Sequence, residues 1–237
     1  MTHPASIGKQ PSHPKDIDYQ EGGIIGIDKP YRWTSFDAVK KIRGALKIKK
    51  IGHAGTLDPL ATGLLILCTG KMTKQIEYFQ AQEKEYEGTL VLGKTTPSVD
   101  LETDFDSETS IDHISETVVR EKVGQFQGEI QQVPPAHSAV KVRGERVYKK
   151  ARRGENVKLE PRTVVIKVFE ITSISLPEVH FRVVCSKGTY IRSLVRDFGN
   201  ALGVGAHLYA LRRTRIGDIH VKDAYTITDF LAQVNLQ

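Results

Sequence analysis

Runs of apolar residues separated by turn-forming segments divide the chain into short predicted strands. The first run is GGIIGIDKP, residues 22–30, which ends at a proline. LLILCTG, residues 64–70, is a continuous apolar run of the kind found in a buried strand. YEGTLVLG, residues 86–93, alternates instead, and two further strand-like runs follow at residues 163–171 and 179–185. The pattern predicts a sheet assembled from several separate segments.

Other segments carry apolar residues at helical spacing. Residues 34–47 begin with capping residues and predict an amphipathic helix, with shorter helices at 71–80 and 114–125. The apolar stripe of the first helix consists of Phe36, Val39, Ile42 and Leu46. A last helix follows Gly188, and its stripe consists of Ile191, Leu194, Val195, Phe198 and Leu202. Arg192 and Arg196 lie off that stripe.

Strands outnumber helices, and the two do not alternate regularly. This arrangement favours an α+β fold with a mixed, mainly antiparallel sheet over a doubly wound one. The polar, proline-interrupted residues 1–20 predict a flexible N-terminal tail. A length of 237 residues then leaves a single domain over residues 21–237.

Composition narrows the functional classes. The net charge of +6 permits a polyanionic partner without requiring one. Cys68 and Cys185 lie far apart in apolar runs, which indicates buried thiols in a reducing compartment. No His/Asp/Glu cluster favours a metal site, and neither a signal peptide nor a membrane span is predicted. We therefore expect a cytoplasmic protein with no membrane association.

Positive charge is concentrated in two segments. The polar face of the predicted helix 34–47 carries lysine and arginine residues, which could be solvated or could contact nucleic acid. Residues 131–154 are the most cationic part of the chain, with Tyr148 placed among the basic residues. A basic loop of this kind serves solubility or binds nucleic acid, and composition alone leaves both interpretations open.

The segment GHAGTLDPLATG, residues 52–63, surrounds one carboxylate with turn-forming residues. Pro59 favours extended backbone at Asp58, and the flanking glycines permit close approach of another backbone or of a ligand. Asp58 is therefore either a turn acid that binds its own backbone or an acid aimed at a substrate. A functional carboxylate needs a cationic partner, and Arg192 is a plausible donor.

Five segments in this order resemble the TruB family, the bacterial tRNA pseudouridine-55 synthases. The segments are GIIGIDKPYRWTSFDAVKKIR, KKIGHAGTLDPLATGLLIL, KEYEGTLVLG, QVPPAHSAVKVRGERVYKKARRGE and CSKGTYIRSLVRDFG. The resemblance implies the pseudouridine synthase fold with a central RNA-binding cleft. It also implies isomerisation of uridine-55 in the tRNA T-loop, by base flipping and without metal or cofactor.

The resemblance also implies roles for individual residues. Asp58 matches the essential aspartate, which would attack ribose C1′ or uracil C6 or would first remove a 2′ proton. Tyr86 matches the tyrosine that stacks on the target base, and Arg192 matches the arginine paired with the aspartate. His53 matches the histidine that fills the gap left by the flipped nucleotide.

Further RNA-binding residues follow from the same resemblance. Lys29 matches a KP motif that supports the catalytic loop, and Tyr190 matches a residue lining the uracil pocket. Segment 131–154 matches a thumb loop that clamps the T-arm. Its basic residues expected to contact RNA are Lys149, Lys150, Arg152 and Arg153.

Two departures from the family pattern affect the expected partners. His137 stands where the family often has an aromatic residue, and the C-terminal PUA-type domain of most bacterial members is not expected here. We expect a monomer that binds the tRNA T-arm. The alternatives are a guide-RNA-directed synthase of H/ACA type, which normally keeps the PUA domain, or a tRNA-binding chaperone without catalysis.

Overall fold

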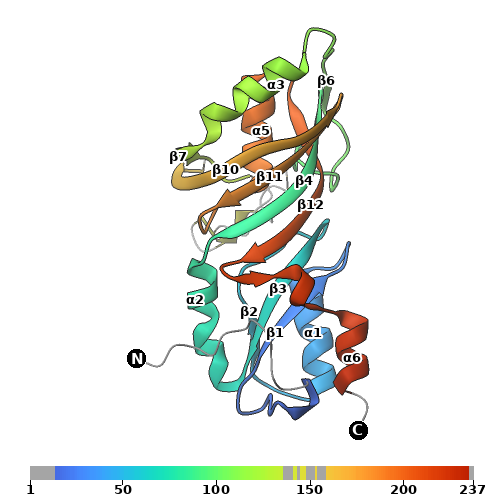
Figure 1. Ribbon diagram of the computed structural model, residues 1–237, viewed down its shortest axis with the longest axis vertical. Coiled ribbons are helices and arrows are strands. Elements are labelled where there is room, and N and C mark those ends of the chain that lie inside the picture. Colours follow the sequence, from blue (N-terminus) through green and yellow to red (C-terminus); the bar gives the residue numbers. More distant parts are fainter. Residues whose placement is uncertain (1–13, 136–140, 143–144, 148–152, 154–158, 235–237) are drawn as a thin grey trace. The chain divides into compact units, whose positions relative to one another are not determined.

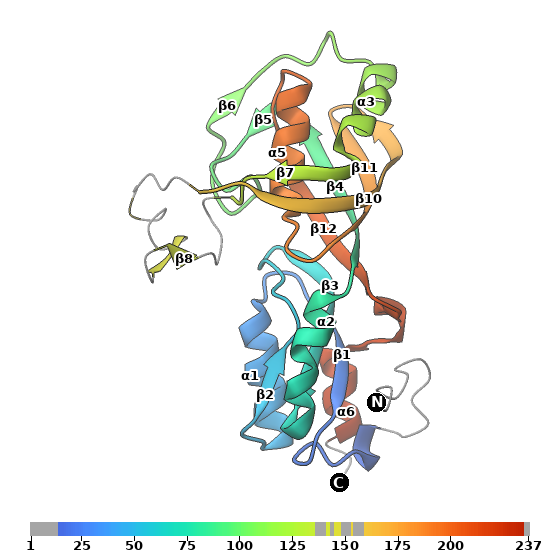
Figure 2. The same ribbon diagram turned by 90° about the vertical axis from the view of Figure 1, so that its left-hand side faces the viewer.

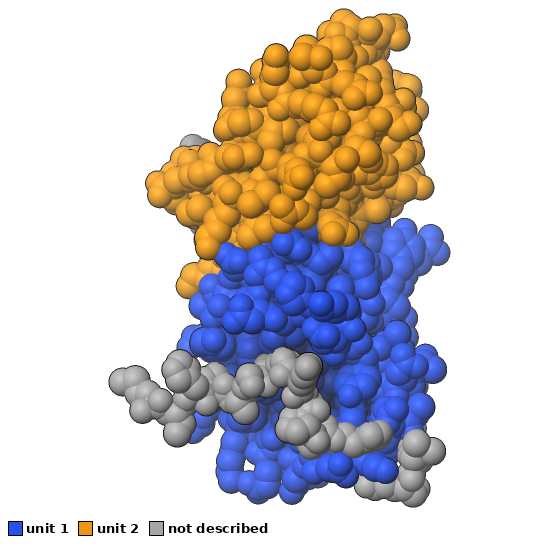
Figure 3. Space-filling model, viewed as in Figure 1, with its two compact units in different colours: residues 1–86, 212–237 blue, residues 87–211 orange. Residues whose placement is uncertain are grey.

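The computed structural model describes residues 14–135, 141–142, 145–147, 153 and 159–234. These residues form two compact units, which are coloured separately in Figure 3. Unit 1 comprises residues 1–86 and 212–237, and unit 2 comprises residues 87–211. The prediction of a single domain over residues 21–237 stays a prediction.

The elements of each unit are as follows. Unit 1 contains η1 (Pro14–Asp16), β1 (Ile24–Lys29), α1 (Ser35–Leu46), β2 (Ile51–His53), β3 (Ala61–Thr69), η2 (Gly70–Gln75), α2 (Ile76–Ala81), β13 (Ile219–His220), η4 (Val221–Asp223), β14 (Tyr225–Thr226) and α6 (Ile227–Val234). Unit 2 contains β5 (Lys94–Thr95), β6 (Ser107–Glu108), α3 (Glu116–Lys122), η3 (Val123–Phe126), β7 (Gly128–Gln132), β8 (Lys141–Val142), β9 (Glu145–Arg146), β10 (Arg162–Ser175), β11 (Glu178–Cys185) and α5 (Ile191–Ala201). β4 (Lys84–Leu92) and β12 (Ala206–Ile216) contribute to both units.

The sheet is mixed and mainly antiparallel, as predicted. In unit 1 the strand order is β14-β1-β3-β12, where β1 is antiparallel to β3 and parallel to β14. In unit 2 the order is β12-β4-β11-β10-β7, with β10 antiparallel to both of its neighbours. The α+β fold class is therefore confirmed.

Strand β3 of unit 1 is buried on both faces, which explains its continuous apolar sequence. Leu65 and Leu67 face a cluster that includes Val39 and Ile42 of α1. Phe230 of α6 belongs to the same cluster, and α1 and α6 contact each other (Figure 1). The alternate β3 residues, Leu64, Ile66 and Cys68, pack in a second cluster with Phe79 of α2.

Helix α1 begins as predicted, but one of its predicted core residues is exposed. Thr34 and Asp37 form a reciprocal capping box, in which each side chain accepts from the other residue's backbone N–H. Val39 and Ile42 are buried, whereas Phe36 is 61% exposed. At 100° per residue Phe36 lies roughly 120° from Ile42 around the helix, at the edge of the apolar stripe.

The segment 14–20 differs from the predicted flexible tail. Pro14 is buried in η1, and Tyr19 is only 8% exposed. The ring of Tyr19 packs edge-on against Phe230, with 6.0 Å between centroids. These residues therefore belong to the core of unit 1, because an aromatic side chain inside a polar segment supplies enough apolar surface to dock it.

The core of unit 2 is aromatic. Phe198 of α5 lies 5.3 Å from Phe169 and 5.6 Å from Phe126, both measured between ring centroids. The predicted stripe of α5 is confirmed, since all five of its residues are buried. Arg192 lies off that stripe but is also buried, at 4% exposure, so its guanidinium is enclosed and not solvated. Both thiols, Cys68 and Cys185, are buried as predicted.

Among the described residues, no helix is both long and apolar enough to cross a bilayer.

Gly63 lets β12 lie close to β3, and a substitution at this glycine tests the packing between the two strands. Its φ is +103°, and an added Cβ would lie 2.3 Å from the carbonyl oxygen of Arg213. We expect Gly63→Ala to lower the free energy of unfolding by about 3 kcal/mol or more, measured by urea denaturation. Gly124→Ala is the control, because a Cβ there meets no described atom within 4 Å. Equal effects of the two substitutions would contradict this packing.

Candidate active site

The loop that carries Asp58 joins β2 to β3 within unit 1. Asp58 is half-buried, and its carbonyl accepts from the N–H of Ala61 at 3.1 Å, which closes a tight turn around Pro59. The neighbouring residue Leu57 is 3% exposed and anchors the loop in the core. The backbone around the acid is therefore fixed on both sides.

Side chains from three different elements hold the carbonyls of this loop. Arg213 of β12 donates to Gly55 O at 3.2 Å and to Thr56 O at 3.5 Å. Ser35 of α1 donates to Leu57 O at 3.2 Å and accepts from Leu57 N at 2.9 Å. These contacts satisfy backbone groups that an irregular loop would otherwise leave exposed to water or unpaired.

Lys29 holds the remaining side of the loop. Its ammonium is fully buried and donates to Pro59 O at 3.4 Å, Pro30 O at 3.0 Å and Trp33 O at 2.6 Å. Burial lowers the pKa of Lys29 to about 8, against an opposing attraction to the Asp58 carboxylate. The lysine therefore ties the strand end at Pro30 to the loop that bears Asp58.

Arg213 is a second buried cation beside this loop. It is 1% exposed, and its Nε donates to Leu64 O at 2.7 Å in addition to its two contacts with the loop. The absence of a side chain at Gly63 lets the backbone of Arg213 come close. The space that the sequence left open beside Gly63 for a ligand is therefore occupied by the chain itself.

His53 lies at the end of β2, five residues before Asp58. Burial lowers the pKa of the imidazole, and the nearby Arg213 charge lowers it further, against a hydrogen bond with the Gly55 backbone that raises it. The ring is therefore mainly neutral at pH 7. Within the described part of the chain, the buried Nδ1 of His53 has no hydrogen-bond partner.

Tyr86 is 8% exposed and lies on β4, at the C-terminal boundary of the first segment of unit 1. Its strand is anchored by Lys84, whose buried ammonium donates to Phe79 O at 3.2 Å and Gln80 O at 2.6 Å, and also to Gln82 O. Lys84 thereby caps the C-terminal end of α2 and fixes the start of β4 against it.

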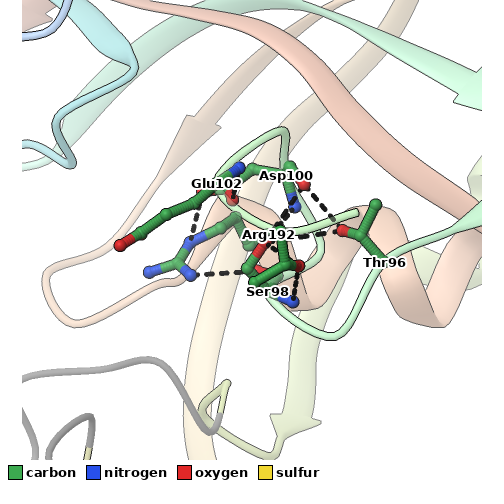
Figure 4. Close-up of polar contacts among 6 residues, drawn as sticks. Thr96, Ser98, Asp100, Glu102 and Arg192 are labelled. Atoms are coloured by element: carbon green, nitrogen blue, oxygen red, sulfur yellow. Dashed lines mark hydrogen bonds and ion pairs between the residues drawn. The ribbon is translucent and has the colours of Figure 1, made fainter. Parts of the chain in front are cut away.

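Arg192 of α5 is held by a loop of unit 2 (Figure 4). Its Nη1 donates to Ser98 O at 3.0 Å, and its Nε lies 3.7 Å from Oδ2 of Asp100. Asp100 is 5% exposed, so this ion pair is almost fully enclosed. The carbonyl of Asp100 accepts in turn from Thr96 and Ser98. The segment 98–100 thus orients the predicted arginine.

Tyr190 precedes α5, and both of its backbone groups are tied to Gln132. The Tyr190 N–H donates to Gln132 Oε1 at 2.8 Å, and Gln132 Nε2 donates to Tyr190 O at 3.1 Å. The guanidinium of Arg162 lies 5.6 Å from the centre of the Tyr190 ring. Hydrogen bonds therefore hold the backbone of Tyr190, and its ring lies beside the Arg162 guanidinium.

Only part of the predicted thumb loop lies within the described residues. Arg153 is exposed at a turn. His137, Lys149, Lys150 and Arg152 fall outside the described residues. Their roles stay predictions.

Four supporting residues were missed by the sequence interpretation, namely Ser35, Asp100, Gln132 and Arg213. All act through contacts between segments distant in sequence, up to 158 residues apart for Arg213 and Gly55. The sequence LRRTR does place cations in a strand, where alternate side chains must face inward. That alternation was the available signal for a buried arginine.

Within the described residues, no group of three or more His, Cys, Asp and Glu side chains could hold a metal ion.

Solved structures share this fold. A chain of a Cbf5-Nop10-Gar1 complex matches with a TM-score of 0.71 and 32% identity, over 93% of this chain and 57% of that one. An H/ACA RNP bound to a substrate RNA containing 2′-deoxyuridine matches with a TM-score of 0.68 and 28% identity, over 94% and 59%. This chain thus spans less than two thirds of each of those chains.

Sequence relatives match over nearly their full length. The tRNA pseudouridine synthase B of Flavobacterium johnsoniae is 56% identical over 220 residues, which is 90% of this chain and 96% of that protein. The protein of the same name from Phocaeicola vulgatus is 51% identical over 221 residues, covering 90% and 94%.

The fold and the names of these relatives define a pseudouridine synthase, which is an isomerase. Residues 43–191 match the TruB family pseudouridylate synthase N-terminal domain, and residues 192–237 match the tRNA pseudouridylate synthase B C-terminal domain. The chain belongs to the TruB family. The predicted pseudouridine synthase fold, enzyme class and family are confirmed.

The depressed pKa of Lys29 predicts a pH dependence of stability. Its folded-state pKa of about 8 lies below the ordinary value of 10.5, so the unfolded chain binds more protons between these pH values. The free energy of unfolding should therefore gain about 1–2 kcal/mol from this group between pH 7.5 and 9.5. Urea denaturation of Lys29→Met should lack this gain. Lys222→Met, at an exposed position of the same unit, should keep it; loss in both variants would contradict the assignment.

Proposed function

We propose that this protein isomerises uridine-55 of the tRNA T-loop to pseudouridine by base flipping, with Asp58 as the catalytic carboxylate. The observation that carries the proposal is the fixed Asp58 loop, in which buried side chains hold the carbonyls on both sides of the carboxylate. A loop held in this way keeps a reactive group at one position before the substrate arrives.

The names of the relatives support tRNA as the substrate. Proteins 51% and 56% identical over nearly their whole length are called tRNA pseudouridine synthase B. The Cbf5 and H/ACA structures, which favour the guide-RNA-directed alternative, are only 28–32% identical and extend well beyond this chain. The tRNA T-arm is therefore the preferred partner, bound by a cytoplasmic monomer.

The reaction balances without a cofactor. The C1′–N1 bond of the uridine breaks, the detached uracil turns, and a C1′–C5 bond forms; C5 loses its proton and N1 gains one. Asp58 attacks C1′ or C6, or first removes the 2′ proton, and these routes are distinguished only by trapping experiments. Tyr86 stacks on the base and assists removal of the C5 proton.

Arg192 is proposed to pair with the Asp58 carboxylate once RNA is bound. Its guanidinium has several N–H groups in one plane, and the enclosed contact with Asp100 fixes the orientation of that plane. Charge-assisted hydrogen bonds of this type keep a carboxylate ionised and oriented. Asp100 is thus a positioning residue for Arg192.

The target nucleotide must leave the T-loop stack before it can react. His53 is proposed to fill the resulting gap, where a mainly neutral ring suits contact with a base. Tyr190 is proposed to line the uracil pocket. Lys149, Lys150, Arg152 and Arg153 are proposed to contact phosphates of the T-arm.

A single assay tests the proposal. Purified protein incubated with an unmodified T-arm stem-loop, without any guide RNA, should convert one T-loop uridine to pseudouridine. Asp58→Asn should abolish product while RNA affinity stays within about threefold of wild type, since Arg213, Ser35 and Lys29 hold the loop through its backbone carbonyls. Asp104→Asn, at an exposed acid in unit 2, is the matched control and should retain activity. Absence of product from the wild-type protein would refute the proposed function.

A further inference from the structure

An exposed stripe on α1 joins one aromatic residue to three cations. The spacing of Phe36, Lys40 and Arg43 places them on one face of α1, and Lys47 follows as the C-cap residue; all four are exposed. Figure 2 shows α1 at the left-hand margin of unit 1. We propose that this stripe, called here the α1 stripe, binds the substrate RNA within a few nucleotides of the target uridine. The inference rests on the proposed function and adds a second RNA contact surface to it.

The α1 stripe begins next to the catalytic loop. Ser35, the first residue of α1, exchanges two hydrogen bonds with the backbone of Leu57. Phe36 follows Ser35 in the chain, and Asp58 follows Leu57. Consecutive Cα atoms are about 3.8 Å apart. Phe36 and Asp58 are therefore each one residue away from the hydrogen-bonded pair Ser35 and Leu57, and they lie near each other. RNA that delivers a uridine to Asp58 therefore passes beside Phe36.

Phe36 is 61% exposed at the edge of the apolar stripe of α1, so its ring contributes less to the core than the buried Val39 and Ile42 do. Tyr31, in the preceding loop, is 48% exposed and extends the aromatic surface. Aromatic rings that water surrounds in this way stack readily on unpaired bases, and each such contact is sequence-tolerant.

The loop bearing Tyr31 is held in an unfavourable conformation. Arg32 has a φ of +64°, which is unusual for a residue other than glycine, and its guanidinium lies 5.5 Å from the centre of the Tyr31 ring. Lys29 fixes the two ends of this loop through Pro30 O and Trp33 O. The same ammonium holds the catalytic loop, so Tyr31 and Arg32 are kept at a defined place beside it.

Gly44 gives an independent indication that something approaches the helix closely. It lies in the interior of α1, where glycine costs about 1 kcal/mol relative to alanine. A Cβ at Gly44 would meet no described atom within 4 Å, so packing inside the protein does not require glycine there. Bare backbone beside Lys40 and Lys47 would leave room for an RNA strand.

The charge of α1 favours RNA over an apolar protein surface as the partner of the α1 stripe. α1 contains one acid, Asp37, and its carboxylate is engaged in the capping box with Thr34. Asp37 also attracts Lys40, but one acid against Lys40, Lys41 and Arg43 leaves the helix with an excess of positive charge, which suits a phosphate backbone and not a hydrophobic protein surface.

The test compares RNA affinity and turnover in matched variants. Phe36→Ala should weaken equilibrium binding of a T-arm stem-loop by at least fivefold while the rate at saturating RNA stays near wild type. Lys40→Ala should weaken binding and reduce the slope of log affinity against log salt by about 0.7–1. Lys41→Ala removes the same charge from another side of the helix and should change affinity less than twofold. Gly44→Ala should raise the melting temperature yet weaken binding.

The outcomes separate this inference from the proposed function. Wild-type affinity in Phe36→Ala, Lys40→Ala and Gly44→Ala would overturn the inference even if pseudouridine forms normally. Unchanged RNA affinity together with lost self-association of Phe36→Ala would assign Phe36 to an interface between copies of the chain, which also overturns it. If the wild-type protein binds the stem-loop without forming pseudouridine, the proposed function fails, but the affinity comparison still decides the role of the α1 stripe.

Discussion

The hydrogen bonds to the carbonyls of residues 55–59 are the constraint on which the active-site architecture depends. Arg213, Ser35 and Lys29 reach this loop from three separate elements, and Ala61 closes the turn at Asp58 itself. Burying two cations costs desolvation free energy, which oriented carbonyl dipoles and a nearby carboxylate offset in part. The need for Gly63 follows directly, because Arg213 reaches the loop only if its backbone lies against β3.

This arrangement fixes the backbone on both sides of Asp58, the carboxylate proposed to react with the uridine. Arg213, Ser35 and Lys29 hold the loop through its backbone carbonyls. Arg192 is held in a comparable manner in unit 2, where Asp100 and Ser98 contact its guanidinium. Each unit thus orients one of the proposed catalytic groups through buried polar contacts, which set the geometry of such a group before a substrate binds.

Sequence patterns anticipated the features that depend on local periodicity. Strands β1, β3 and β4, the cap of α1 and the buried stripe of α5 follow from apolar runs, alternation, capping chemistry and helical spacing. The predicted burial of Phe36 and the predicted flexibility of the segment around Tyr19 were wrong for the same reason. Phe36 lies at the edge of a stripe and Tyr19 lies in a polar segment, so in each case packing against distant elements decides burial. Local patterns could not predict the supporting roles of Arg213, Gln132 and Asp100 either, because their partners lie far away in sequence. The resemblance to a family supplied the site residues, but not the residues that support them.

The central claim is that the Asp58 loop is preformed before RNA binds, and amide hydrogen exchange of the free protein measures this directly. The amides of Leu57 and Ala61 donate to Ser35 Oγ and Asp58 O, so they should exchange slowly, at rates close to those of the β3 core. Arg213→Lys, which keeps the charge but loses the guanidinium fork, should accelerate exchange at these amides while β1 stays protected. Rapid exchange of both amides in the free wild-type protein, with protection only after addition of tRNA, would contradict the account.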